Sequence, residues 1–262
     1  MSSSRFDVEE RQDEDQEDLH DDDLQQEDVR RGSWFGRLLK LLILLAIGLV
    51  LLAQLFYFMQ VVFYRWYDPP TSALMRQQAT VLAALDPPKS IKHEWVPYDK
   101  ISRYAKEAVV AAEDSGFMDH GGIEWEAIER AYRVNAQAGV IAQGGSTITM
   151  QLAKNLFLST DRSYIRKAQE IAIALMIELV LDKRRILELY LNMVEFGQGV
   201  FGIEAAARHY FNTSAAKLTR YQAAWLASIL PAPRRYDKNR NSAWIERKTR
   251  TVMQRMNQVS IP

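Results

Sequence analysis

The sequence predicts a mainly α-helical protein with one membrane-spanning helix near its N-terminus. Three observations predict this class: an uncharged apolar run from Leu41 to Tyr64, a series of segments with helical periodicity behind it, and no convincing period-two alternation over more than four residues. The chain has 262 residues, of which 48% are hydrophobic and 25% charged. This composition is typical of a folded body, and the length allows one core of ordinary size after the anchor.

The formal net charge of zero hides an uneven distribution of charge. Residues 1–28 hold 13 acidic and 2 basic side chains, whereas the rest of the chain holds 20 acidic and 31 basic ones. Because residues 1–37 combine few apolar side chains with high net charge, we expect them to form a disordered acidic tail.

Residues 38–64 are expected to form a transmembrane anchor. At 1.5 Å per residue the uncharged run reaches about 36 Å, enough to cross a hydrocarbon core of about 30 Å with some tilt. A buried helix of a soluble protein would show a polar stripe, and a cleaved signal peptide would have a shorter apolar core. Because Arg30, Arg31, Arg37 and Lys40 closely precede the run, the N-terminus is expected in the cytoplasm and the body outside it.

Residues 65–92 are expected to form a juxtamembrane connector, because proline pairs flank a short helical stretch there. Residues 93–262 form the body, in which helix start and stop signals recur. They predict helices over residues 102–112, 123–137, 146–156, 163–181, 182–194, 202–211, 219–230 and 242–259, with Ser146 capping the third and Pro231 and Pro233 ending the seventh. The Gly197-x-Gly199-x-x-Gly202 spacing has no βαβ unit around it and predicts a helix–helix turn.

The residue inventory excludes several kinds of site. With no cysteine, the chain has no disulfide, thiolate zinc site, iron–sulfur site or cysteine nucleophile. Its four histidines are scattered, so a histidine-based metal cluster is not expected.

Two groups of residues at predicted helix ends are candidates for chemistry. The first is Glu113–Asp114, followed by a glycine-rich loop with Phe117 and His120. Adjacent helical side chains point about 100° apart, so only one of the two carboxylates can face a given cleft. An acidic pair at a helix end is more often an exposed, solvated feature of the surface than part of a functional site. The second group is residues 143–147, where glycines and the free N–H groups of a helix start would suit an anion, although an ordinary loop and cap look the same.

The third group lies on the helix that follows. Gln151, Lys154 and Asn155 share one face of it, and Arg162 comes shortly after. Clustered cations and amides are what a diphosphate needs, although an exposed surface of the same composition is common.

The fourth group begins the next helix. Arg166 and Lys167 stand in its first turn, where the macrodipole disfavours positive charge, and Glu170 adjoins an apolar turn. We therefore expect a compensating group from outside this helix. A structural salt bridge would explain Glu170 equally well.

Taken in order, four motifs resemble those of the peptidoglycan glycosyltransferases, glycosyltransferase family 51. They are EDSGFMDHGG, GGSTITMQLAKN, RKAQEIAIALMIE and ILELYLNMVEFGQGVFGIEAAARHYF, and the resemblance covers roughly residues 95–233. Met118 and Met150 depart from the usual pattern, which affects fine contacts only. The resemblance implies a lysozyme-like, α-rich domain over residues 93–262 with a small membrane-facing lobe. The chain ends without room for a transpeptidase domain, so the resemblance is to monofunctional members.

The resemblance also implies an activity. Members polymerise lipid II into glycan strands with inversion at the anomeric carbon and release polyprenyl diphosphate. The attacking hydroxyl must lose its proton, so a general base is needed; the resemblance assigns that role to Glu113. Glu170 matches a second essential glutamate that orders the cations or the donor phosphate, for which a divalent metal, Mg²⁺ or Mn²⁺, is a candidate. Substrate contacts are implied for Asp114, Phe117, His120, Ser146, Thr147, Gln151, Lys154, Asn155, Arg162, Arg166 and Lys167.

The implied setting is a bacterial inner membrane with the catalytic domain in the periplasm. Expected partners are lipid II, the growing strand, the bilayer and other cell-wall synthesis proteins, but not nucleic acid; the basic body favours diphosphates and anionic lipid. Two rivals remain open. A lysozyme-like hydrolase would use a glutamate of raised pKa as general acid, although it would not need the cations, and a non-catalytic scaffold would need neither.

Overall fold

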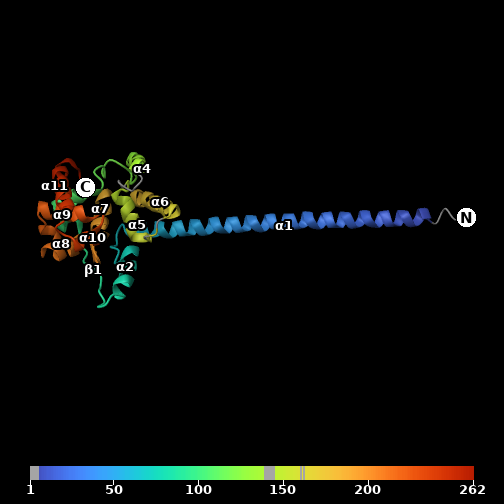
Figure 1. Cartoon of the computed structure of the whole chain (residues 1–262), viewed down its shortest axis with the longest axis horizontal. Coiled ribbons are helices and arrows are strands. Elements are labelled where there is room, and N and C mark those ends of the chain that lie inside the picture. Colours follow the sequence, from blue (N-terminus) through green and yellow to red (C-terminus); the bar gives the residue numbers. More distant parts are fainter. Residues whose placement is uncertain (1–5, 139–144, 160, 162) are drawn as a thin grey trace. The chain divides into compact units, whose positions relative to one another are not determined.

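The computed structural model describes residues 6–138, 145–159, 161 and 163–262. The chain divides into two units, residues 1–56 and residues 57–262 (Figure 1). Helices account for most of the described residues, so the predicted mainly α class is confirmed.

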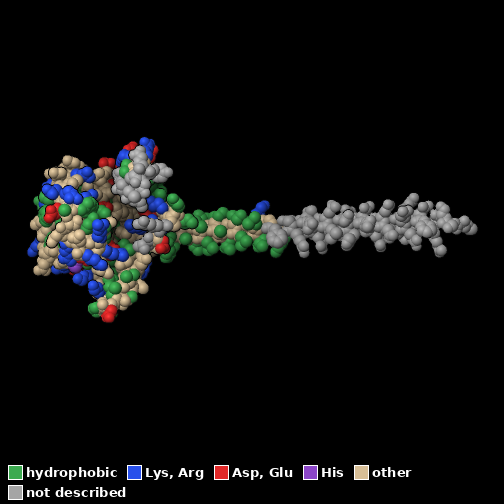
Figure 2. All heavy atoms as spheres, viewed as in Figure 1, with side chains coloured by type: hydrophobic (Ala, Val, Ile, Leu, Met, Phe, Trp, Pro, Cys, Tyr) green, Lys and Arg blue, Asp and Glu red, His purple; other side chains and the backbone are tan. Residues whose placement is uncertain are grey.

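The first unit is part of the long helix α1, Phe6–Phe63. Within the described residues, Gly36–Phe63 is the one helical stretch long and apolar enough to cross a membrane, with a mean hydropathy of 2.6. No part of its most apolar stretch is buried, whereas the core helix of a soluble protein would be covered. Figure 2 shows hydrophobic side chains over the surface of this stretch. These features are those of a single-pass membrane anchor.

The acidic segment differs from its predicted state. We expected residues 1–37 to be disordered, but α1 is helical from Phe6 onward. The spanning helix supplies a formed nucleus, so the acidic residues extend an existing helix without the cost of starting a new one. The composition of residues 1–37 alone does not indicate that this segment continues the spanning helix.

The second unit contains ten further α-helices among the described residues. They are α2 Ala73–Ala83, α3 Arg103–Glu113, α4 Trp125–Ala138, α5 Ile148–Phe157, α6 Tyr164–Val180, α7 Lys183–Met193, α8 Ile203–Phe211, α9 Arg220–Ile229, α10 Pro233–Lys238 and α11 Ala243–Arg255. Short 3-10 turns occur at Tyr98–Lys100, Ala215–Lys217 and Met256–Gln258. The expected start signals largely hold, since the side chains of Ser102, Ser163, Asp182, Thr219 and Ser242 cap α3, α6, α7, α9 and α11.

Two predicted helix boundaries are wrong. Thr147, not Ser146, caps α5, because its hydroxyl accepts the Met150 N–H and its backbone is extended. Pro233 does not end α9 but opens α10 at its first position, where the missing N–H of proline costs nothing.

The predicted helix–helix turn around Gly199 is a β-hairpin. Strand β2, Glu195–Gly197, pairs antiparallel with β3, Val200–Phe201, and β1, Lys92–His93, adds to β3 in parallel with Lys92 opposite Val200. The sheet order is β1-β3-β2. Gly199 and Gly202 have φ of +74° and +82°, which glycine adopts freely. Strands this short leave no visible alternation in the sequence.

One continuous core joins these elements from Val61 to Met256. Within it α9 packs on α3 and α11, and α5 packs on α6 and α7. Figure 1 shows α8, α9 and α11 on one side of the second unit, α4, α5 and α6 on the other, and α7 between them. The last turns of α1 join this core, because Val61 is buried and the Tyr57 ring meets Phe157 edge-on at the end of α5.

The fully buried Asn192 joins α7 to the chain before α3. Its Oδ1 accepts the Val96 N–H at 2.8 Å, and its Nδ2 donates to the Val96 carbonyl at 2.9 Å. Both backbone groups would otherwise be buried without a partner, which is costly.

We predict that Asn192→Ala lowers the free energy of unfolding by about 1–3 kcal/mol, because it leaves two buried backbone groups unsatisfied. The measurement is the urea midpoint of the full chain in detergent. The matched control is Asn239→Ala, since Asn239 is exposed. Equal midpoints for the two variants would contradict this account of the α7 junction.

Candidate active site

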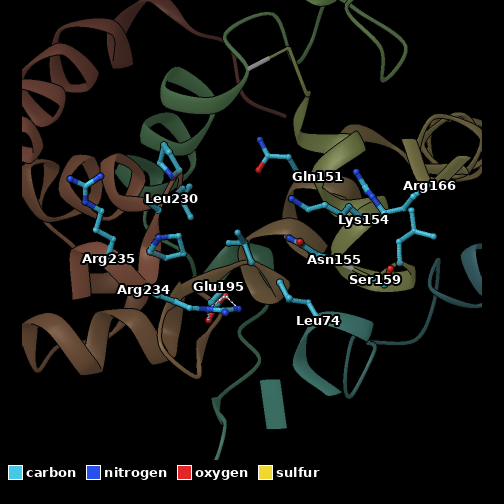
Figure 3. A pocket seen from close by; sticks show the side chains of 15 residues that line it. Leu74, Gln151, Lys154, Asn155, Ser159, Arg166, Glu195, Leu230, Arg234 and Arg235 are labelled. Atoms are coloured by element: carbon cyan, nitrogen blue, oxygen red, sulfur yellow. Dashed lines mark hydrogen bonds and ion pairs between the residues drawn. The ribbon is translucent and has the colours of Figure 1, made fainter. Parts of the chain in front are cut away.

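A cleft of about 600 Å³ opens between α5 and residues 230–235 (Figure 3). One wall carries Gln151, Lys154, Asn155 and, from α6, Arg166. The facing wall and ends carry Leu74, Leu158, Ser159, Val194, Glu195, Leu230, Pro231, Ala232, Pro233, Arg234 and Arg235. Figure 3 shows Gln151 and Lys154 projecting into the space from α5. Gln151, Lys154 and Asn155 of the third predicted group thus line a cleft and do not lie on an open surface.

Glu113 is the last residue of α3 and reaches this wall through Gln151. Gln151 Nε2 donates to Glu113 Oε2 at 2.8 Å. Burial raises the pKa of Glu113 above its ordinary value, while the Gln151 bond and the charges of Lys248 and Lys154 act in the opposite direction. A carboxylate of raised pKa beside a cleft has the character of a proton acceptor.

Gln151 is itself held from behind by Tyr190, a residue that the sequence reasoning missed. The Tyr190 hydroxyl donates to Gln151 Oε1 at 2.9 Å, and its side chain is fully buried in α7. Burial raises the pKa of Tyr190 well above its ordinary value, so the hydroxyl keeps its proton. In the sequence, Tyr190 stands in the apolar run ILELYLN, where its hydroxyl is the one signal that could have singled it out.

Asp114 points away from Glu113, as expected of adjacent carboxylates. Its Oδ2 accepts the Ile148 N–H at 3.0 Å, and its Oδ1 lies 2.8 Å from His120 Nε2. Because His120 Nδ1 accepts the Gly122 N–H at 3.0 Å, the ring proton sits on Nε2 and is donated to Asp114. Asp114 therefore ties the end of α3 to the start of α5.

Asp114, His120 and Thr147 form the clasp, the set of hydrogen bonds that joins the end of α3, the loop after it and the start of α5. Phe117 lies in the same loop. Phe117 has no exposed surface, and Lys183 Nζ lies 4.6 Å from its ring centroid. Thr147 Oγ1 donates to the Gly122 carbonyl at 2.5 Å. The side chain of Phe117 is sealed in the core, and its predicted substrate contact stays a prediction. Asp114, His120 and Thr147 hold the loop in place and do not line the cleft.

The fourth predicted group forms a compact ionic cluster. The buried Glu170 accepts from Arg166 Nη1 at 2.7 Å and from Lys167 Nζ at 2.6 Å. Lys167 also donates to Ser146 Oγ at 2.9 Å, so Ser146 is a hydrogen-bond acceptor for this cluster. We expected compensation for the two cations from outside α6, but Glu170 one turn along the same helix provides most of it.

Lys154 links this cluster to Glu113. Burial lowers the pKa of Lys154, while the nearby charges of Glu170 and Glu113 oppose that shift. The electrostatic influence is mutual, since the charge of Lys154 acts on Glu113. Through Gln151, Glu113 thus adjoins the cleft wall that carries Lys154. Arg162, Gln143 and Gly144 lie outside the described residues.

The donor sets do not fit the expected divalent metal. Both oxygens of Glu170 already accept from cations, which repel a metal ion. Asp114, His120 and Glu124 have ligand atoms within 4.8 Å of one another, but the Asp114–His120 pair shares a proton and Glu124 pairs with Arg130 at 2.8 Å. We therefore derive no step through a metal.

The facing wall adds charges that no local pattern indicates. Arg234 makes a two-pronged pair with Glu195, with N–O distances of 2.9 to 3.1 Å, so its charge is matched. Arg235 is exposed on the same wall. Arg234 lies 39 positions after Glu195 in the sequence. Lys248, whose charge reaches Glu113, is still further along the chain.

Comparison with known proteins gives consistent matches. A family model described as Transglycosylase matches residues 78–257. The chain is 52% identical to the biosynthetic peptidoglycan transglycosylase of Herminiimonas arsenicoxydans over 226 residues, 86% of this chain and 98% of the relative. It is 52% identical to the biosynthetic peptidoglycan transglycosylase of Bordetella pertussis over 238 residues, which cover 89% of this chain and 98% of the relative. It is 49% identical to that of Laribacter hongkongensis over 216 residues, which cover 82% of this chain and 95% of the relative. The family match supports the lysozyme-like class predicted from the motifs.

We predict that Asp114→Ala destabilises the fold by about 1–3 kcal/mol, because the buried Ile148 N–H loses its acceptor. Amide hydrogen exchange at Ile148 should accelerate, and the urea midpoint should fall. Asp119→Ala is the matched control, since Asp119 is exposed in the same loop. Unchanged exchange at Ile148 would contradict the clasp.

Proposed function

This chain belongs to the transglycosylase family and is a peptidoglycan transglycosylase, and from that premise we propose that it polymerises lipid II into glycan strands with inversion and releases polyprenyl diphosphate. The observation that carries the proposal is the hydrogen bond of 2.8 Å between Gln151 Nε2 and Glu113 Oε2, which joins the carboxylate to a cleft wall that carries Lys154 and Arg166. Lipid II transfer needs both a proton acceptor and a partner for a departing diphosphate.

The proposed step transfers a glycosyl group from the diphosphate of the donor to a hydroxyl of the acceptor. The sugar hydroxyl of the acceptor gives its proton to the Glu113 carboxylate as its oxygen forms a bond to the anomeric carbon of the donor. The bond from that carbon to the diphosphate oxygen breaks, and the diphosphate leaves with the electron pair. Attack from the face opposite the leaving group inverts the configuration.

The cations supply what the leaving group needs. Lys154 and Arg166 line the cleft, and Lys167 stands beside them on α6. Charge-assisted hydrogen bonds to phosphate oxygens are stronger than neutral ones. Among the described residues, the buried Arg166 Nε has no hydrogen-bond partner, and an anionic oxygen is a suitable acceptor for it.

A hydrolase is the second candidate, because a glutamate of raised pKa is also the general acid of lysozyme-like hydrolases. The cation cluster favours transfer, since cleavage of finished glycan releases no diphosphate. Products distinguish the two: lipid II should yield polymer, and insoluble cell wall should not dissolve.

We further propose that α1 holds the body at the periplasmic face of the bacterial inner membrane, with its N-terminus in the cytoplasm. A substrate with a long polyprenyl tail keeps its headgroup at the bilayer surface, which is where an anchored enzyme meets it. The bilayer, the growing strand and other cell-wall synthesis proteins are the partners of this proposal.

We predict that Glu113→Gln lowers lipid II polymerisation at least about 100-fold while the variant stays folded, because general-base catalysis contributes about 10²- to 10⁴-fold. The assay follows polymer formation by the full chain in detergent. Glu246→Gln on the exposed face of α11 is the control. Unchanged polymerisation in Glu113→Gln would contradict the role of the base, and a scaffold would show no polymerisation in the wild type either.

The pH profile gives a separate prediction. The base must be deprotonated to act, and burial raises the pKa of Glu113 above 4.5. Activity should therefore be lost as the pH falls through that raised value, so the acid limb of kcat/KM should lie above 4.5. A rate that stays constant down to the range where an exposed glutamate titrates would contradict it.

We predict that Lys154→Met lowers kcat/KM for lipid II by about 10- to 100-fold, because hydrogen bonds to charged groups contribute about 1.5–3 kcal/mol. Steady-state kinetics on the full chain measures the change. Lys217→Met, at an exposed position that does not line the cleft, is the control. Equal kinetics for both variants would contradict the placement of the diphosphate.

A further inference from the structure

Tyr190, Gln151 and Glu113 form a chain of hydrogen bonds from the core to the cleft. The Tyr190 hydroxyl donates to Gln151 Oε1 at 2.9 Å, and Gln151 Nε2 donates to Glu113 Oε2 at 2.8 Å. The three residues come from α7, α5 and α3, so the chain crosses three packed helices.

We propose that Tyr190 is a positioning residue that fixes the orientation of the Gln151 amide and thereby makes Oε1 of Glu113 the oxygen that takes the proton of the acceptor sugar. This inference rests on the proposed function, because it concerns the same proton transfer. It adds a residue outside the cleft lining to the machinery of the base.

The side-chain amide of Gln151 can adopt two orientations. An amide has a donor end and an acceptor end, and rotation by 180° exchanges them. A phenol that keeps its proton needs a hydrogen-bond acceptor. Among the described residues, the Tyr190 hydroxyl donates to Gln151 Oε1. The hydroxyl therefore selects the orientation in which Nε2 faces Glu113.

This orientation determines where Glu113 can hold a proton. Oε2 already accepts the Gln151 N–H, whereas no hydrogen bond to Oε1 occurs among the described residues. Both lone pairs of Oε1 are therefore open to the proton of the acceptor sugar, which favours Oε1 as the oxygen that takes it. The same bond favours the charged carboxylate and partly offsets the effect of burial. Without Tyr190 the amide could rotate, and a protonated Glu113 could then donate to Gln151 Oε1.

Several charged groups also act on Glu113. Lys154 comes from α5, Lys248 from α11 and Asp114 from the end of α3. The two lysines lower the pKa of Glu113 and Asp114 raises it. A substitution at Tyr190 leaves these three side chains in place, so a change in titration reports on the amide.

The test uses Tyr190→Phe in the full chain, in detergent, with lipid II as substrate. Phenylalanine keeps the ring and removes only the donor. We expect the acid limb of kcat/KM to move to higher pH by about one unit, because the carboxylate loses the fixed donor. KM should change little, since the hydroxyl is buried behind Gln151. An unmoved acid limb would overturn the proposal.

Two further variants separate positioning from packing. Tyr210→Phe also removes a hydroxyl that bonds to a backbone carbonyl, that of Phe196, and should leave the profile unchanged. In a Gln151→Leu background the shift caused by Tyr190→Phe should vanish, because the effect passes through the amide. A full shift in that background would overturn the proposal.

A direct titration keeps the inference separable from the proposed function. The ¹³C signal of the Glu113 carboxyl carbon, identified by its absence in Glu113→Gln, reports its pKa without substrate. We expect a higher pKa in Tyr190→Phe than in the wild type. If this shift appears but lipid II is not polymerised, the proposed function fails, while the inference that Tyr190 orients the Gln151 amide stands. If polymerisation occurs without the shift, only the inference about Tyr190 fails.

Discussion

The Glu113 carboxylate is bonded to Gln151, which lines the cleft together with Lys154, and the rest of the site depends on this constraint. Burial raises the pKa of Glu113 and lowers that of Lys154, while each charge opposes the shift of the other. Burial disfavours the charged form of both groups, and the opposite charge of the neighbour favours it. The pair therefore requires a rigid wall, which Gln151 provides by its bond to Glu113 and its place on the same helix as Lys154.

The surrounding fold fixes that wall at both ends. Asp114 accepts the Ile148 N–H and so attaches the start of α5 to the end of α3. At the other end Phe157 contacts the rings of Tyr57, in the last turns of α1, and Tyr64, directly after α1. The helix that carries Gln151 and Lys154 is thus attached to the end of α3 at its start and to residues 57–64 at its end.

The sequence predicts the features that local interactions determine. Helix starts such as Ser102 and Thr219 were predictable, because a cap bonds to backbone only two or three residues away. The hairpin around Gly199 was not, since its strands are too short to show a period. Glu113 and Lys154 were predicted as site residues from their motifs. Tyr190 was not, because its role depends on a contact with a residue 39 positions away that only the tertiary fold creates.

The most direct measurement is the pKa of the Glu113 carboxyl with and without inorganic pyrophosphate, followed by ¹³C NMR in the full chain. If base and cations share the cleft, the bound anion adds negative charge near Glu113 and offsets the charge of Lys154, so the pKa rises in the wild type. In Lys154→Met, where the anion loses a partner, the rise should be smaller. A Glu113 pKa that is the same at saturating pyrophosphate would contradict the account.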